Sequence, residues 1–208
     1  MDYLKDPDAI YSASFAAIGE AVDLDPVPQT LRKTVTRLIH SCGMPEILPN
    51  LQWSGDPVTP ARAALEDSKP VLVDATMVAS GITRRFLPKQ NNVICTLNAP
   101  ETRDLAKQTS TTRSAAAVDL WLPHLEGAVI AIGNAPTALF RLLEILQQPG
   151  TSRPAAIFAF PVGFVGAAES KEALIEAKLD IPYLTLRGRQ GGSAFAAAAI
   201  NAVALGDQ

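Results

Sequence analysis

The chain has 208 residues, of which 48% are hydrophobic and 19% are charged, a composition that excludes a disordered segment and predicts one domain over residues 1–208. Its net charge of -3 argues against a general nucleic-acid-binding protein, because such proteins are usually basic. Two cysteines and two histidines are too few for a zinc site of three or four such ligands, so we expect no bound metal.

A helix is predicted over residues 28–42. Its apolar residues recur with helical spacing at Leu31, Val35, Leu38, Ile39 and Cys42. His40 falls on the opposite side of this helix, one turn after Arg37 and shortly before Gly43, which suits a helix C-cap. The helix carboxyl end stabilises a positively charged imidazole, whereas a nearby arginine opposes it. His40 and Arg37 therefore belong either to a solvated cationic face or to a cleft where His40 donates a proton and Arg37 binds a carboxylate.

Five short apolar runs are predicted as strands buried on both faces. A helical pattern follows each of the last three of these strands. The strands cover residues 70–73, 93–97, 128–132, 155–160 and 182–186, and the helices cover 134–147, 168–178 and 193–204. This alternation predicts a three-layer α/β/α fold with a mostly parallel central sheet. Ligands bind beyond the carboxyl ends of the strands in such sheets. The candidate site loops therefore begin near Asp74, Asn98, Gly133, Pro161 and Arg187.

Two of these loops, residues 133–136 and 188–193, contain glycine and precede a predicted helix. Their backbone N–H groups either bind an anion, such as a phosphate or carboxylate, or form a turn with a helix cap. Pro136 fits a first helical turn, where its missing N–H costs little. Neither loop matches a dinucleotide-binding or P-loop pattern, so a nucleotide-binding domain is a weaker hypothesis.

Several arginines lie beside glycine, serine or threonine, which points to a small ligand with several carboxylates. They are Arg84, Arg85, Arg113, Arg187 and Arg189. Surface solvation is the alternative for each of them. His124 follows a proline and is expected in a loop without a catalytic role.

The cysteines and apolar stretches predict the environment of the chain. Cys42 and Cys95 lie far apart in apolar sequence, which predicts buried thiols in a reducing cytoplasm and no disulfide. No apolar stretch reaches the roughly 20 residues that a membrane span needs, and the first residues are too polar for a secretory signal. We therefore expect no membrane association.

Motifs along nearly the whole chain resemble the precorrin-8X methylmutase family, which includes cobalt-precorrin-8 methylmutases. The matching segments are AIY at 9–11 with Ser14 and Phe15, RLIHSCG at 37–43, ARAAL at 61–65, DATMV at 74–78, GITR at 81–84, VICTL at 93–97, TRSAA at 112–116, IGNAPTALF at 132–140, PVGFVGAAESK at 161–171, and RGR at 187–189 with GGSA at 191–194. Residues 44–60 match the family least, so the resemblance does not say what this loop does in substrate entry.

The resemblance implies a cytoplasmic isomerase of cobalamin biosynthesis that moves a methyl group from carbon 11 to carbon 12 of precorrin-8X, or of cobalt-precorrin-8, to give hydrogenobyrinate or cobyrinate. It implies that His40 donates and accepts a proton, that Ser14 and Arg37 contact the tetrapyrrole substrate, and that Thr83 and Arg113 lie in the pocket. It further implies a homodimer with the pocket near the subunit interface, and no cofactor. The alternative from another class is a non-catalytic tetrapyrrole carrier that holds the corrin product.

Overall fold

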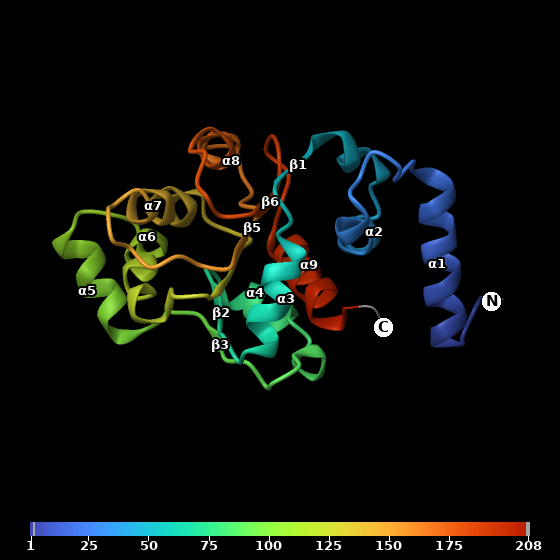
Figure 1. Ribbon diagram of the computed structural model, residues 1–208, viewed down its shortest axis with the longest axis horizontal. Coiled ribbons are helices and arrows are strands. Elements are labelled where there is room, and N and C mark those ends of the chain that lie inside the picture. The colour runs from blue at the N-terminus through green and yellow to red at the C-terminus, as the bar shows by residue number, and fades with distance from the viewer. Residues whose placement is uncertain (2, 207–208) are drawn as a thin grey trace.

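The computed structural model describes residue 1 and residues 3–206 (Figure 1), and within these residues six strands form one sheet in the order β1-β6-β5-β4-β2-β3. The strands are β1 (Leu51–Ser54), β2 (Val71–Val73), β3 (Val93–Ile94), β4 (Val129–Ile132), β5 (Ala156–Ala159) and β6 (Tyr183–Leu186). Strands β2 to β6 pair in parallel, and β1 pairs antiparallel with β6, where Leu51 lies opposite Leu186. The mostly parallel sheet predicted from the sequence is confirmed.

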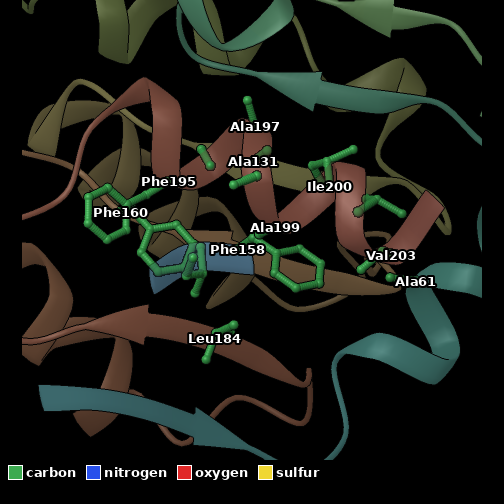
Figure 2. Packing of buried hydrophobic residues seen from close by; sticks show 14 of the residues in the cluster. Ala61, Ala131, Phe158, Phe160, Leu184, Phe195, Ala197, Ala199, Ile200 and Val203 are labelled. Carbon is green, nitrogen blue, oxygen red and sulfur yellow. The ribbon is translucent and has the colours of Figure 1, made fainter. Parts of the chain in front are cut away.

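Four helices pack on one face of the sheet or on the helices that cover it: α2 (Gln29–Cys42), α3 (Val58–Glu66), α4 (Thr76–Gly81) and α9 (Ser193–Leu205). The alanine-rich helix α9 is at the centre of this layer, and its small side chains let it lie close to the strands. Figure 2 shows Phe158 and Phe160 of the β5 segment packed with Ala199 of α9, together with Leu184 of β6. This core fixes where α9 presents its opposite side.

The other face of the sheet is covered by α7 (Pro136–Leu146) and α8 (Ala167–Glu176), with α6 (Arg113–Asp119) beside α7 and α5 (Pro100–Gln108) packed against α6. Alternate strand residues supply the second core: Ile130 and Ile132 face this side, whereas Val129 and Ala131 face the first. The three-layer α/β/α arrangement expected from the sequence is therefore confirmed.

Helix α1 (Pro7–Ala21) lies outside these layers and packs against α2 (Figure 1). Ile18 is the buried residue of α1, and Asp6 caps its first turn by accepting the Ala9 N–H at 2.8 Å. The short 3₁₀ helices are η1 (Pro45–Asn50), η2 (Arg84–Phe86) and η3 (Leu122–His124). No helix in the described part of the chain is both long and apolar enough to cross a bilayer.

Candidate active site

The apolar side of α2 is buried as its sequence predicted, and His40 emerges on the exposed side. Leu31, Val35 and Leu38 are fully buried, whereas His40 is exposed in the last turn. Gly43 ends the helix in the left-handed conformation (φ 67°), and its N–H donates to the Ile39 carbonyl at 2.8 Å. The expected C-cap is therefore confirmed, and it leaves the imidazole near the carboxyl end of α2.

Ser14 on α1 holds one nitrogen of this imidazole. The Ser14 Oγ lies 2.8 Å from His40 Nδ1. The Nε2 atom of His40 has no hydrogen bond to any residue that the structure describes. Because one ring nitrogen is engaged by the protein, the other is the one available to a ligand.

Two aromatic rings from α1 flank both His40 and Arg37. Tyr11 and Phe15 stack with their centroids 4.3 Å apart, and their centroids lie 5.8 and 5.4 Å from the His40 ring. The guanidinium of Arg37 lies over both aromatic rings and donates a hydrogen bond to the Tyr11 hydroxyl. These contacts fix the directions of the cation and the imidazole together.

A cleft of about 300 Å³ opens beside His40. It is lined by Arg37, His40 and Ser41 of α2, Gly81 of α4, and Ala194, Ala197, Ala198 and Asn201 of α9. The α9 residues have helical spacing and form one wall made almost entirely of methyl groups. A shallow, apolar wall opposite a histidine and an arginine suits a flat ring that carries carboxylates.

Gly81 is required where α4 meets α9. A Cβ atom on residue 81 would lie 2.7 Å from the Cβ of Ala197. The end of α4 therefore rests directly on the alanine wall of the cleft, and even one added methyl group would separate the two helices.

Asn201 connects the cleft to Thr83. The Thr83 backbone N–H donates to Asn201 Oδ1 at 2.8 Å, and Asn201 Nδ2 donates to the Gly81 carbonyl at 3.0 Å. Thr83 thus adjoins the cleft through Asn201 but is not among the residues that line it. Asn201 was not predicted from the sequence, although a single amide in an alanine-rich helix is a pattern that could have revealed it.

Arg113 lies away from His40 within one chain. It begins α6, on the other side of the sheet, and Figure 1 shows α6 and α2 towards opposite ends of the long axis. Its Nη2 donates to the Leu97 carbonyl at 3.2 Å and to Asn98 Oδ1 at 2.7 Å. The fold therefore brings Ser14, Arg37 and His40 together, places Thr83 next to them, and leaves Arg113 elsewhere.

The backbone N–H groups of the glycine loop before α7 are already bound by a carboxylate of the protein. The Asp74 carboxylate, 1% exposed, accepts the N–H groups of Gly133, Asn134 and Ala135 at 2.8, 3.0 and 2.7 Å. Burial raises the pKa of this carboxyl, and the three hydrogen bonds act against that change. Of the two interpretations of residues 133–136, the structure favours a helix cap over a site for an external anion.

The loop before α9 is held by its neighbours. The Gly192 N–H donates to the Phe160 carbonyl at 2.8 Å, and a Cβ on residue 191 would lie only 2.3 Å from that oxygen. The fully buried Lys171 donates from Nζ to the Gln190 carbonyl at 2.6 Å, and burial lowers the pKa of this lysine to about 8. The loop is a rigid connection that sets the start of α9.

The other residues selected from the sequence have simple surroundings. His124 lies exposed in η3. Arg187 pairs with Glu172 at 3.3 Å, and the Arg189 guanidinium lies 5.3 Å from the centroid of the Phe164 ring. Cys42 and Cys95 are half-buried, and neither forms a disulfide.

Comparisons with known proteins agree over almost the whole chain. The family model described as "CbiC: Precorrin-8X methylmutase" matches residues 9–205. The precorrin-8X methylmutase of Pseudomonas aeruginosa is 51% identical over 204 residues, with 98% of each chain covered, and that of a Sinorhizobium species is 51% identical over 203 residues, covering 98% of this chain and 96% of the relative. The cobalt-precorrin-8 methylmutase of Priestia megaterium is 33% identical over 200 residues, covering 96% and 88%. The solved structure of a precorrin-8x methyl mutase from Thermus thermophilus superposes with a TM-score of 0.85 at 33% identity, covering 95% of this chain and 94% of that one.

Proposed function

The chain belongs to the precorrin-8X methylmutase family and is a methyl-migrating isomerase of cobalamin biosynthesis, and from that premise we propose that His40 is its acid–base residue. The observation that carries the proposal is the pairing of His40 Nδ1 with Ser14 Oγ at 2.8 Å, beside a cleft, with Nε2 left unpaired within the described chain. The carrier hypothesis is disfavoured, because the matched relatives are named as methylmutases.

Ser14 determines which ring nitrogen of His40 exchanges a proton with the substrate. When His40 is protonated, its Nδ1–H donates to the Ser14 oxygen, and its Nε2–H is the proton that can be given to the macrocycle. After that transfer the neutral ring keeps the Nδ1–H bonded to Ser14 and has a lone pair on Nε2, which can take a proton back. Nε2 is therefore the atom that exchanges a proton with the bound macrocycle.

The proton promotes the methyl shift and is then recovered. His40 gives its Nε2 proton to the macrocycle, which makes the carbon next to the methyl-bearing one electron-poor. The methyl group moves with its bonding electron pair from carbon 11 to carbon 12, and a proton returns to Nε2. No atom is gained or lost, so the chain supplies a positioned acid and a rigid wall that holds the ring.

Arg37, Thr83 and Arg113 form the substrate-binding site in this proposal. Arg37 is directed by Tyr11 and lines the cleft, so it can meet a carboxylate of the macrocycle. Thr83 supports the cleft through Asn201. The substrate is metal-free precorrin-8X and the product hydrogenobyrinate, because the two relatives named for precorrin-8X are 51% identical, whereas the cobalt-precorrin-8 methylmutase of Priestia megaterium is 33% identical.

We also propose a cytoplasmic homodimer of a single methylmutase domain. Arg113 begins α6 and does not line the His40 cleft of its own chain, which favours a dimer in which a second copy supplies Arg113 to that cleft. In a symmetric dimer each cleft then takes His40 from one subunit and Arg113 from the other. The two unpaired cysteines suit a reducing compartment.

Conversion of precorrin-8X, followed by its visible spectrum, tests the role of His40. We expect the purified protein to convert the substrate. His40→Ala should bind the substrate but turn it over at least about 100-fold more slowly. The fold of His40→Ala should survive because the side chain is exposed. Full activity of that variant would disprove the role, and binding without conversion by the unchanged protein would restore the carrier hypothesis.

A further inference from the structure

A second cavity, of about 280 Å³, opens beyond β3 at the amino-terminal ends of α5 and α6, and it shares no lining residue with the His40 cleft. It is lined by Leu97, Asn98, Ala99, Pro100, Arg103 and Arg113. Two of these side chains are guanidinium groups, and none is a carboxylate. We propose that Arg103 and Arg113 together form a carboxylate-binding site that holds one acidic side chain of the macrocycle bound at the partner subunit's cleft.

Arg113 is oriented but not neutralised. Both of its hydrogen bonds, to the Leu97 carbonyl and to Asn98 Oδ1, come from Nη2. Asn98 in turn donates to Thr76 Oγ1 at 3.4 Å. The Nε and Nη1 donors of Arg113 have no partner among the residues that the structure describes, and both acceptors that orient it are uncharged. The guanidinium is thus held in place with donors left for a ligand.

Arg103 adds a second positive charge without a counter-ion. It lies in the first half of α5 and makes no hydrogen bond or ion pair with any described residue. Glu101 and Asp104, its acidic neighbours on α5, do not line the cavity. Two guanidinium groups that share a cavity repel each other, and an anion between them converts this repulsion into two charge-assisted pairs. The amino-terminal end of α5 at Pro100 adds a partial positive charge on the same side.

A carboxylate on a short flexible stem fits this site better than a larger anion. The cavity is small, and its uncharged lining of Leu97, Ala99 and Pro100 can contact the methylene groups of such a stem. The rim of the macrocycle carries acetate and propionate groups. This inference rests on the proposed function, because it places Arg103 beside Arg113 at the far edge of the substrate from His40.

Substitution of Arg103 tests the site. Lys107→Gln is the matched control, because it also removes one exposed positive charge from α5. We expect Arg103→Gln to raise KM for precorrin-8X about tenfold with kcat unchanged, and Arg103→Lys to recover part of the loss. Lys107→Gln should leave both constants unchanged. The dissociation constant for hydrogenobyrinate, measured from its visible spectrum, should rise in parallel with KM. An unchanged KM and dissociation constant in Arg103→Gln would overturn the proposal.

Mixed dimers test which cleft Arg103 serves. When Arg103→Gln subunits are mixed with a large excess of His40→Ala subunits, most of them pair with a His40→Ala subunit. The working His40 of such a dimer is on the Arg103→Gln subunit, and its cleft receives the intact Arg103 of the His40→Ala subunit. Turnover should therefore show the KM of the unchanged protein. A KM that stays raised in the mixture would overturn the placement across the interface.

Two further outcomes separate the possible failures. If free acetate raises the melting temperature of the unchanged protein but not that of Arg103→Gln, while KM is the same for both, the cavity takes a free carboxylate and the proposal is wrong. If the unchanged protein binds hydrogenobyrinate in an Arg103-dependent way but fails to convert precorrin-8X, the proposed function fails and the carboxylate site stands.

Discussion

The carboxylate of Asp74 accepts the backbone N–H of Gly133 at 2.8 Å, and this contact ties the end of β2 to the beginning of α7. The same carboxylate also accepts the N–H groups of Asn134 and Ala135. Three donors at a helix amino terminus are thus satisfied by one side chain that lies 59 positions earlier than the first of them. The loop between β4 and α7 gains its shape from this internal anion.

Asp74→Ala should lower the free energy of unfolding by about 3 kcal/mol, because it leaves three N–H groups without their acceptor. Urea denaturation measures the change. Asp67→Asn is the matched control, since Asp67 is exposed after α3 and its substitution removes one negative charge elsewhere. A loss below about 0.5 kcal/mol in Asp74→Ala would show that water replaces the carboxylate without cost.

Ser14→Ala should lower kcat about tenfold and leave KM nearly unchanged, because it removes the hydrogen bond that fixes the ring nitrogens of His40 but no carboxylate contact. Steady-state conversion of precorrin-8X gives both constants. Ser12→Ala on the same helix serves as control, since Ser12 is exposed and has no such bond. An effect confined to KM would instead make Ser14 a substrate contact alone.

Gly81→Ala should destabilise the fold by about 1 to 3 kcal/mol and reduce activity, because the new methyl group would overlap Ala197 at 2.7 Å. Adding Ala197→Gly should recover most of the activity, although glycine in a helix costs about 1 kcal/mol in stability. Melting temperature and turnover of the two single variants and the double variant test this coupling. Purely additive effects would contradict the contact.

Mixed subunits test the homodimer. Assayed far below KM, His40→Ala and Arg113→Gln should each have little activity alone, the first through a lower kcat and the second through a higher KM. Mixed in equal amounts after subunit exchange, they should recover about one quarter of the activity of the unchanged protein, because half of the dimers are mixed and each has one intact site. No recovery would show that both residues act in the same subunit or that subunits do not pair in this way.

The buried Lys171 should make the free energy of unfolding depend on pH. Burial lowers its pKa from 10.5 to about 8 in the folded protein, so between these values the unfolded chain binds a proton that the folded chain has lost. Its contribution to the free energy of unfolding therefore rises as pH increases through about 8 towards 10.5. Compared with Lys171→Met, the unchanged protein should gain about 1 to 2 kcal/mol from pH 7 to pH 10 in urea denaturation. A constant difference between the two proteins would refute the assignment.

Local patterns explain why α2 and His40 could be predicted. The spacing of Leu31, Val35 and Leu38 defines the buried side of a helix by itself, so the exposed position of His40 follows from the sequence. The parallel strands β2, β4 and β5 could be predicted for the same reason, since each is a continuous apolar run. The resemblance to the family then supplied the roles of the site residues.

Contacts between distant segments explain what was missed. Strand β1 includes the polar residues Gln52 and Ser54 and exists because β6 offers an edge for antiparallel pairing, which no local pattern reveals. The strand expected over residues 93–97 ends at Ile94; beyond it the Ala99 N–H donates to the Thr96 carbonyl across a turn, and the Thr96 hydroxyl donates to the Ala117 carbonyl. Helices α1 and α3 to α6 were not predicted, since most are short, and α1 has one buried residue.

The alanine wall of α9 has a consequence for the entropy of binding. Alanine has no side-chain rotamers, so Ala194, Ala197 and Ala198 lose no conformational freedom when a ring comes to lie on them. The same wall cannot adapt by moving a side chain, so a ring of a different shape would meet it at few points. The cleft should therefore select substrates by ring shape at little entropic cost, and leave chemical discrimination to the few polar groups at its edge.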